Sequence, residues 1–259
     1  MPTTRVVVTR PQPQADEWAQ RLRAAGFDAV ALPLLGIEAA DDPAPVDAAW
    51  RALAGADAPA MLVFVSPNAV ERFFARCPAG ATWPARVTAA APGPGTAQVL
   101  LARGVPPACL VQPAADAPQF DSEALWARLR ERDWRGAHVL IVRGDGGRDW
   151  LCETLRAAGA DVDFVQAYQR GAPQPTVAER ALLAQALAAP GGHLWLFSSS
   201  EAVGRLRALA PHAAWRGATA LCSHPRIAEA ARALGVGRVH EVRPAFDAVV
   251  GVLREVARG

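Results

Sequence analysis

The sequence predicts an α/β protein made of two similar lobes, each a five-stranded parallel sheet with helices on both faces. Short runs of β-branched and other apolar residues alternate with segments rich in Ala, Leu and Arg at helical spacing, which is typical of parallel α/β layers. Several segments also recur at a nearly constant distance along the chain, which indicates a duplicated unit. The 259 residues, 51% of them hydrophobic, suffice to bury one large or two small cores.

The repeat joins separated parts of the chain. The pentapeptide LRAAG occurs at residues 22–26 and again at 155–159, a step of 133 residues (155 − 22). At the same step, the apolar run ending in Thr9-Arg10 recurs as the run ending in Val142-Arg143, and residues 64–70 recur as 197–203. Matches at one offset predict two copies of one α/β unit with a cleft between them.

Ten strands are expected, five in each lobe. In the outer segments of the chain we expect strands at residues 5–9, 28–32, 193–197, 218–222 and 238–242. In the middle we expect strands at residues 61–65, 87–91, 108–111, 137–142 and 161–166. Each set is sufficient for a compact parallel sheet covered by helices.

The order of the repeats predicts how the two lobes share one polypeptide. The N-terminal unit matches residues that come late in the middle block, whereas residues 64–70 come early there. The middle block is therefore expected to be a circularly permuted copy that is inserted into the first lobe. The expected boundaries are residues 1–35 and 170–259 for the first lobe, 38–167 for the second, and 33–39 and 166–171 for the crossings, which should pair as a two-stranded hinge.

Composition argues against several classes of function. The formal net charge of +2 does not indicate binding to nucleic acid or to an anionic membrane. All 27 basic residues are Arg, so the chain has no phosphate-loop, Schiff-base or pyridoxal-anchoring lysine. The four cysteines lie far apart without metal-ligand spacing, and we expect no metal site. No apolar run has the length of a membrane span, so we expect a soluble, cytoplasmic protein.

Candidate binding residues lie where the predicted strands end. In open parallel sheets, ligands bind beyond the carboxyl ends of the strands, next to helix N-termini. Ser66 and Ser199 each follow a strand and precede a helix, so each could cap that helix or bind an anion. Capping is the more common role, but the same arrangement occurs in both lobes. Thr96 lies in a similar turn before a predicted helix.

A loop rich in Arg and Gly follows the strand expected at 137–142. Arg143, Gly144 and Arg148 could form a concave anion site with flanking guanidinium groups, or only a flexible turn with solvated arginines. The loop lacks the ending of a phosphate loop and does not match GxGxxG, which argues against a nucleotide site.

Three further residues are candidates with an ordinary structural alternative. His224 and Arg226 occupy the turn of the first lobe that corresponds to the turn of Thr96, and either could contact a carboxylate. Tyr168, the only tyrosine of the chain, lies in the second crossing, where it could be packing or could face the cleft. No Ser/His/Asp arrangement and no acidic dyad stands out.

At these residues the chain resembles the uroporphyrinogen-III synthases, particularly the bacterial ones. The matching stretches follow the family's order and span nearly the whole chain: residues 8–11, 33–37, 64–70, 95–97, 122–125, 143–144, 147–148, 168–170 and 223–228. Each motif is weak alone, but the ordered set is specific. The family's Gly/Thr turn in the later lobe is replaced here by His224-Pro225-Arg226.

The resemblance implies a HemD-like fold of two flavodoxin-like lobes and a cofactor-independent lyase of haem biosynthesis. It implies that hydroxymethylbilane, a linear tetrapyrrole polycarboxylate, loses water and closes with inversion of ring D through a spiro intermediate. Without the enzyme, closure gives the type I isomer. Tyr168 is the catalytic residue it implies, as a proton donor to the departing hydroxyl. The substrate-binding candidates are Arg10, Ser66, Thr96, Arg143, Gly144, Arg148, Ser199 and Arg226.

Two other interpretations compete with this one. A two-lobed small-molecule-binding protein or sensor would share the cleft, but the sequence shows no export signal and no DNA-binding segment. A nucleotide-dependent enzyme is disfavoured by the missing phosphate loop. The partner expected is the small-molecule substrate, with no nucleic acid and no membrane. We expect a monomer that makes, at most, transient contact with hydroxymethylbilane synthase.

Overall fold

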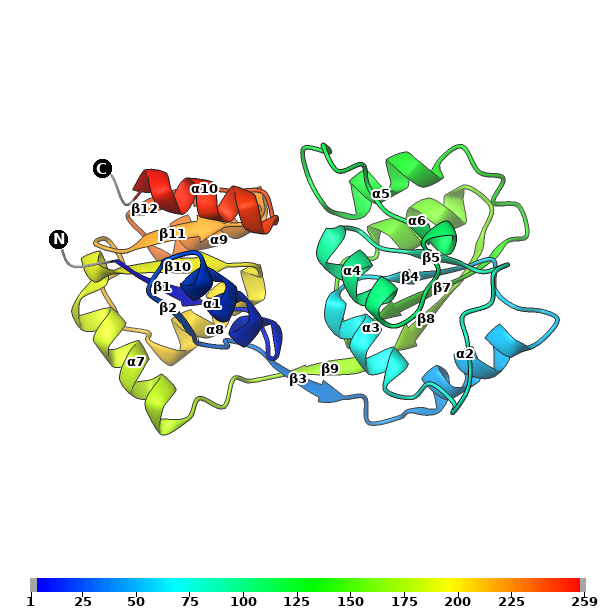
Figure 1. Cartoon of the computed structure of the whole chain (residues 1–259), viewed down its shortest axis with the longest axis horizontal. Helices are drawn as coiled ribbons and strands as arrows, with labels where there is room; N and C mark the ends of the chain where they lie inside the picture. The colour runs from blue at the N-terminus through cyan, green and yellow to red at the C-terminus, as the bar shows by residue number, and fades with distance from the viewer. Residues whose placement is uncertain (1–3, 257–259) are drawn as a thin grey trace. The chain divides into compact units, whose positions relative to one another are not determined.

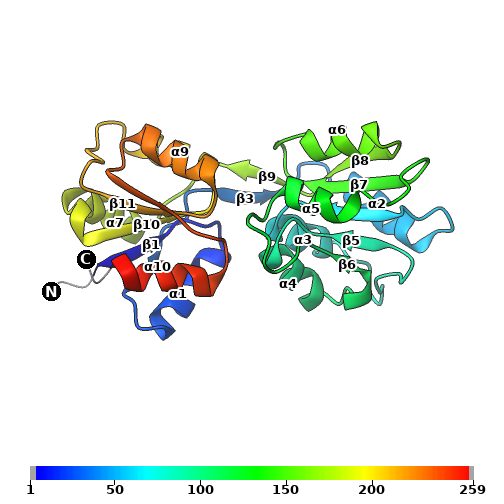
Figure 2. The same ribbon diagram turned by 90° about the horizontal axis from the view of Figure 1, so that it is seen from above.

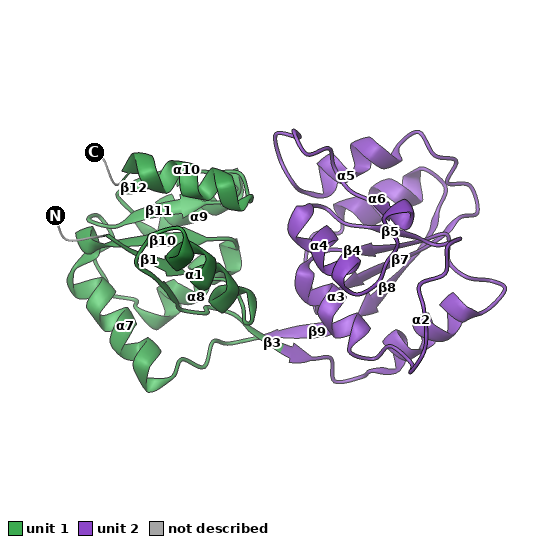
Figure 3. Ribbon diagram, viewed as in Figure 1, with its two compact units in different colours: residues 1–37, 171–259 green, residues 38–170 purple. Residues whose placement is uncertain are grey.

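The computed structural model describes residues 4–256. The chain folds into two compact units (Figure 3): unit 1 comprises Met1–Ile37 and Gly171–Gly259, and unit 2 comprises Glu38–Arg170. Each unit contains a five-stranded sheet in which every described strand pairing is parallel. The predicted fold class, two α/β units with parallel sheets, is confirmed.

Unit 1 is built on the sheet order β12-β11-β10-β1-β2 (Figure 1). Its strands are β1 (Arg5–Val8), β2 (Ala29–Ala31), β10 (His193–Phe197), β11 (Thr219–Cys222) and β12 (Arg238–Glu241). Its helices are α1 (Gln14–Ala24), α7 (Val177–Ala188), α8 (Ser200–Leu209), α9 (Pro225–Leu234) and α10 (Phe246–Val256), with a 3₁₀ segment at Pro190–Gly192. Helix α7 begins with a capping box between Thr176 and Glu179, and α9 ends at Gly235 in the left-handed conformation.

Unit 2 is built on the sheet order β6-β5-β4-β7-β8. Its strands are β4 (Met61–Phe64), β5 (Thr88–Ala90), β6 (Leu110–Val111), β7 (His138–Arg143) and β8 (Asp161–Gln166). Its helices are α2 (Ala44–Ala54), α3 (Pro67–Phe74), α4 (Pro94–Ala102), α5 (Ser122–Leu129) and α6 (Trp150–Ala157). The strand expected at 108–111 is shorter than predicted: a 3₁₀ turn at Pro107–Cys109 replaces its start, and the Cys109 backbone N–H donates to the Pro106 carbonyl oxygen within that turn instead of to a neighbouring strand.

The two sheets have the same strand order once the residues related by the 133-residue step are aligned. Strand β7 then corresponds to β1 and β4 corresponds to β10, so each central pair has the same neighbours. The chain runs through the matching strands in a different order in each unit. The repeated sequence segments therefore occupy equivalent positions in the two sheets.

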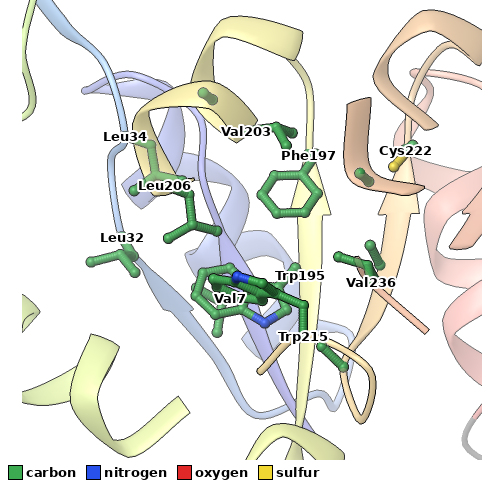
Figure 4. Packing of buried hydrophobic residues seen from close by; sticks show 14 of the residues in the cluster. Val7, Leu32, Leu34, Trp195, Phe197, Val203, Leu206, Trp215, Cys222 and Val236 are labelled. Atoms are coloured by element: carbon green, nitrogen blue, oxygen red, sulfur yellow. The ribbon is translucent and has the colours of Figure 1, made fainter. Parts of the chain in front are cut away.

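Both faces of the unit 1 sheet are covered by helices (Figure 2). Alternate strand residues such as Val7 and Trp195 pack against α7, α8 and α9, whereas Val6 and Leu194 pack against α1 and α10. Figure 4 shows the first of these clusters, in which Trp195 lies 5.5 Å from Trp215, centroid to centroid, in an edge arrangement. Apolar residues at successive strand positions thus serve opposite faces, as a doubly covered parallel sheet requires.

The unit 2 sheet is covered in the same way. Met61 and Ile141 pack against α5 and α6. On the other face an aromatic group joins strand and helices, in which Phe64 contacts Phe73 of α3, which in turn stacks on Trp50 of α2. The Trp50 indole N–H donates to the Phe73 carbonyl oxygen at 3.0 Å. These buried contacts hold the carboxyl end of β4 against α3, which packs in turn on α2.

The chain passes between the units twice, through β3 (Gly36–Ala39) and β9 (Tyr168–Gly171), which pair with each other as a two-stranded sheet. Gly36 lies where a Cβ atom would come within 3.3 Å of the Ala172 carbonyl oxygen. Between residues 4 and 256, no helix combines the length and the apolar character needed to cross a membrane.

Candidate functional site

The strand order of each unit reverses between its two central strands. In unit 1 the chain adds β2 on one side of β1 and β10 on the other, and in unit 2 it adds β5 and β6 on one side of β4 and β7 on the other. Ligands of open parallel sheets bind at the carboxyl ends of such strand pairs. The residues just after β1, β10, β4 and β7 are therefore the first candidates for a binding site in each unit.

Four predicted site residues lie at these two positions. In unit 1, Arg10 follows β1 and Ser199 follows β10. In unit 2, Ser66 follows β4 and Gly144 follows β7. Thr96 and Arg226 lie one strand further out, in the first turns of α4 and α9. The topology thus gathers the predicted residues of each unit at the carboxyl edge of its own sheet.

Tyr168 lies at the unit 2 position together with Ser66. Its hydroxyl oxygen is 3.2 Å from Ser66 Oγ and accepts a hydrogen bond from Arg170 Nη2 at 3.3 Å. Its ring is part of the packing, because the residue is only 2% exposed. The ring of Tyr168 therefore has a packing role, while its hydroxyl contacts the half-buried Ser66.

Gly144 makes this position of the tyrosine possible. A Cβ atom on Gly144 would lie 2.6 Å from Tyr168 Cε2 and 2.8 Å from Tyr168 Cζ, so no side chain fits between them. Arg170 is held in turn, because its backbone N–H donates to Asp145 Oδ1 at 3.2 Å and its Nη1 donates to the Gly146 carbonyl oxygen at 3.1 Å. The loop after β7 thus fixes both the ring and its cationic neighbour.

Ser66 is a helix cap as well as a neighbour of the tyrosine. Its Oγ accepts a hydrogen bond from the Ala69 backbone N–H at 3.2 Å, in the first turn of α3. A serine hydroxyl has one proton to donate and two lone pairs to accept with. Either hydroxyl can be the donor in the contact between Ser66 and Tyr168. When Tyr168 donates, the Ser66 proton is available for a third group.

The two arginines of the β7 loop are paired within the loop's surroundings. Arg143 donates to Asp149 Oδ1 and to the Gly147 carbonyl oxygen, and its guanidinium lies 4.5 Å from the Phe164 ring centroid. Arg148 forms a two-bond ion pair with Glu123, which raises the pKa of Arg148. Both guanidinium groups are therefore already paired with carboxylates of the chain. The alternative of a flexible turn with solvated arginines does not describe these ion pairs.

Arg10 of unit 1 has a different environment. Its guanidinium carbon lies 4.3 Å from the Trp18 ring centroid, and its buried Nε has no hydrogen-bond partner among the described residues. Burial, with a smaller contribution from the positive charge of Arg21, lowers the pKa of Arg10 to about 10. The preceding residue, Thr9, anchors this turn by donating from Oγ1 to the Leu196 carbonyl oxygen at 2.8 Å.

The other candidates of unit 1 are cap residues. Ser199 Oγ accepts from the Ala202 backbone N–H at 3.4 Å and so caps α8. His224 caps α9, because its Nδ1 accepts from the Arg226 backbone N–H at 3.1 Å. Thr96 of unit 2 is 5% exposed in the first turn of α4.

Sequence reasoning did not single out Arg170, Asp145, Trp18 or Arg21. Arg170 was within reach, since it lies in the stretch 168–170 on which the family resemblance rests. The contact of Asp145 with Arg170 joins the loop after β7 to strand β9, 25 positions away, and leaves no local pattern in the sequence. In residues 4–256, no group of three or more His, Cys, Asp or Glu side chains is placed to hold a metal ion.

Comparison with known protein families agrees with this geometry. The model of the family described as uroporphyrinogen-III synthase HemD matches residues 16–251. The chain belongs to the uroporphyrinogen-III synthase family. It is therefore an enzyme of tetrapyrrole synthesis, and the comparisons give no support to a non-catalytic binding protein.

Individual relatives carry the same name. The chain is 34% identical over 179 residues to a uroporphyrinogen-III synthase of Salmonella typhimurium, covering 68% of this chain and 69% of the relative. It is 32% identical over 207 residues to that of Synechococcus elongatus, covering 76% and 71%. A crystal structure of a mutant uroporphyrinogen III synthase from Thermus thermophilus matches 99% of this chain and 100% of that one, with a TM-score of 0.59 at 18% identity. This structural likeness supports the synthase fold.

Proposed function

We propose that this synthase converts hydroxymethylbilane to uroporphyrinogen III, with loss of water and inversion of ring D, and that Tyr168 and Ser66 supply the proton for the departing hydroxyl. One observation carries the proposal of these two residues: the Tyr168 hydroxyl lies 3.2 Å from Ser66 Oγ at the carboxyl ends of β4 and β7. This is the edge of the sheet at which ligands of this architecture bind.

The hydrogen-bond inventory supports a direction for the proton. Ser66 Oγ accepts from Ala69 N–H, and either hydroxyl can be the donor in its contact with Tyr168. In the proposed relay Tyr168 is the donor, which leaves the Ser66 proton for the leaving hydroxyl of the substrate. As Ser66 donates to that hydroxyl, Tyr168 donates to Ser66, and water departs. This relay reconciles a ring that is 2% exposed with a role in proton transfer.

Arg170 stabilises the charge that this transfer leaves behind. The guanidinium Nη2 already donates to the Tyr168 hydroxyl oxygen at 3.3 Å. When Tyr168 gives up its proton, its oxygen becomes negative, and a fixed cationic donor at that distance lowers the energy of the anion. The proton released when the inverted pyrrole regains its aromatic form can return to the tyrosinate. The protein therefore needs no stronger acid than a phenol.

Carboxylate binding gives a role to the candidates that lie at helix starts. Backbone N–H groups at the starts of α3, α4, α8 and α9 point toward the carboxyl edges of the two sheets, near Ser66, Thr96, Ser199 and Arg226. Such groups can hold the side-chain carboxylates of a flexible tetrapyrrole in one arrangement, which favours one ring closure over the other.

We further propose a cytoplasmic monomer without a bound cofactor. The cysteines Cys77, Cys109, Cys152 and Cys222 are free thiols, which supports a reducing compartment. Large exposed apolar side chains of the described residues, such as Val177 and Phe164, lie in separate elements rather than in one patch. A surface without a large apolar patch is compatible with at most a transient contact with hydroxymethylbilane synthase, as we propose.

The test is a rate measurement with freshly prepared hydroxymethylbilane. The protein should consume the substrate faster than the buffer control and should yield the type III isomer, resolved chromatographically after oxidation. The Tyr168→Phe variant should retain the isomer but lose rate. Consumption at the spontaneous rate by folded wild-type protein would reject the function, and an unimpaired Tyr168→Phe variant would reject the proton relay.

A further inference from the structure

Arg10 and Arg143 occupy corresponding places in the two units but differ in charge balance. Both stand at the carboxyl end of the corresponding central strands, β1 and β7, and are related by the 133-residue step (143 − 10). Arg143 is neutralised by Asp149 of its own loop. Arg10 has no ion pair in the described part of the chain, and no acidic group raises its pKa. At this duplicated position, the arginine charge is thus balanced by an acidic side chain in unit 2 but not in unit 1.

The surroundings of Arg10 add positive charge instead of removing it. Arg21 of α1 lies 5.8 Å from the Trp18 ring centroid, on whose face Arg10 lies at 4.3 Å. Arg21 also lies 3.9 Å from the ring centroid of Phe246, the first residue of α10. Within residues 4–256, Arg21 likewise has no acidic partner. Two guanidinium groups therefore share an aromatic support without a counter-charge.

Aromatic contact alone does not balance these charges. Cation–π contacts of this type are weak, whereas burial of a guanidinium nitrogen without an acceptor is costly. The Arg10 Nε is such a nitrogen, and it is oriented by a turn that Thr9 anchors to the neighbouring strand. The Trp18 and Phe246 rings meet edge to face at 5.6 Å and hold both arginines on one framework. An anion with two oxygen atoms could accept hydrogen bonds from both arginines and balance their charge.

We propose that Arg10 and Arg21, supported by Trp18 and Phe246, form a carboxylate-binding site of unit 1, and that Arg143 and Arg148 stabilise the fold rather than contact substrate. The identity of the natural ligand, a side-chain carboxylate of the tetrapyrrole, rests on the proposed function. Carboxylate is favoured because guanidinium groups bind it through paired N–H donors, and because Arg10 follows β1 at the sheet edge where ligands bind.

The site can be tested with uroporphyrin I, a stable tetrapyrrole polycarboxylate, by fluorescence titration of the full-length protein. We expect Arg10→Gln and Arg21→Gln each to weaken binding by about tenfold or more, as loss of a charge-assisted contact requires. Arg254→Gln is the matched control. It removes the same charge from an exposed residue of α10 for which the structure shows no hydrogen bond or ion pair among the described residues. The affinity of this variant for uroporphyrin I should therefore stay within about twofold of wild type.

Arg10→Gln alone could weaken binding by disturbing the fold. Arg21→Gln tests the same site without this ambiguity, because Arg21 is an exposed helix residue whose replacement should not affect folding. Unchanged binding by Arg10→Gln and Arg21→Gln, or an equal loss in Arg254→Gln, would overturn the site. The same holds if wild-type protein does not bind uroporphyrin I. Arginine-dependent binding by a protein that does not convert hydroxymethylbilane would retain the site and reject the proposed function, so the two failures are distinguishable.

Discussion

The hydroxyl of Tyr168 and the Oγ of Ser66 lie 3.2 Å apart, although 102 positions separate the two residues in the chain. Strand β4 ends just before the serine, and β9 begins at the tyrosine, so two different strand ends bring them together. The serine is half-buried, whereas the tyrosine is only 2% exposed. The pair therefore connects a buried phenol to the edge of the sheet.

The Tyr168→Phe variant should lower kcat by about 10- to 100-fold, because it removes the proton without changing the shape of the ring. KM should change little, since a buried ring makes no contact with substrate carboxylates. Steady-state kinetics with hydroxymethylbilane provides the measurement, with circular dichroism to verify the fold. A variant with full kcat would remove Tyr168 from the mechanism.

Ser66 should be sensitive to loss of its hydroxyl but tolerant of threonine. Ser66→Ala removes both the α3 cap, at a cost of about 1 kcal/mol, and the relay proton, so stability and kcat should both fall. Ser66→Thr keeps both functions and should restore most of the activity. Thr176→Ala, which removes the cap of α7, is the matched control for stability and should leave kcat intact. Equal kcat values for Ser66→Ala and Thr176→Ala would argue that Ser66 is only a cap.

Gly144→Ala should disable the enzyme by displacing the tyrosine. The added methyl group would lie 2.6 Å from Tyr168 Cε2, so the ring must move and the contact with Ser66 must lengthen. We expect kcat to fall at least as far as in Tyr168→Phe, with a stability loss of about 1–3 kcal/mol from overpacking. Gly146→Ala is the control, because its methyl group would only approach Arg170 Nη1 at 3.9 Å. Comparable activity in the two alanine variants would contradict this account.

Cys222 should make stability depend on alkaline pH. Burial raises the pKa of this thiol to about 12, whereas an unfolded cysteine ionises near about 8.5. Above the lower value the unfolded chain releases a proton that the folded chain keeps, so rising pH favours unfolding. The Tm advantage of wild type over Cys222→Ala should therefore shrink from about pH 8 to about pH 10. The comparison cancels the titration of Arg10, which both proteins share, and a constant difference would indicate that Cys222 is not shielded from solvent.

The sequence predicted the architecture because the repeat and the apolar periodicity are local signals. The step that relates Thr9-Arg10 to Val142-Arg143 also relates the central strands of the two sheets. The strand expected at 108–111 was begun two residues too early, because a 3₁₀ turn at Pro107–Cys109 precedes β6 at Leu110–Val111. Element type therefore followed from composition and spacing, and the boundaries depended on individual backbone constraints.

Side-chain partners were less accessible from sequence. Arg10 and Arg143 look alike in their repeated context, yet only Arg143 has a neighbouring aspartate in position to neutralise it. The environment of Arg10 depends on Phe246, more than two hundred positions away, through the ring of Trp18. The burial of Tyr168 depends on the missing side chain of Gly144, which no periodicity reveals. The roles of the predicted site residues remain predictions.

The most direct test of the central claim is the isomer composition of the product as a function of protein concentration. Spontaneous closure of hydroxymethylbilane to the type I isomer competes with the catalysed reaction in the same vessel. We predict that the type III fraction rises with wild-type protein until it is nearly complete, and that a higher concentration of the Arg10→Gln variant is needed to reach the same fraction. A product that stays type I at every concentration of folded protein would contradict the account.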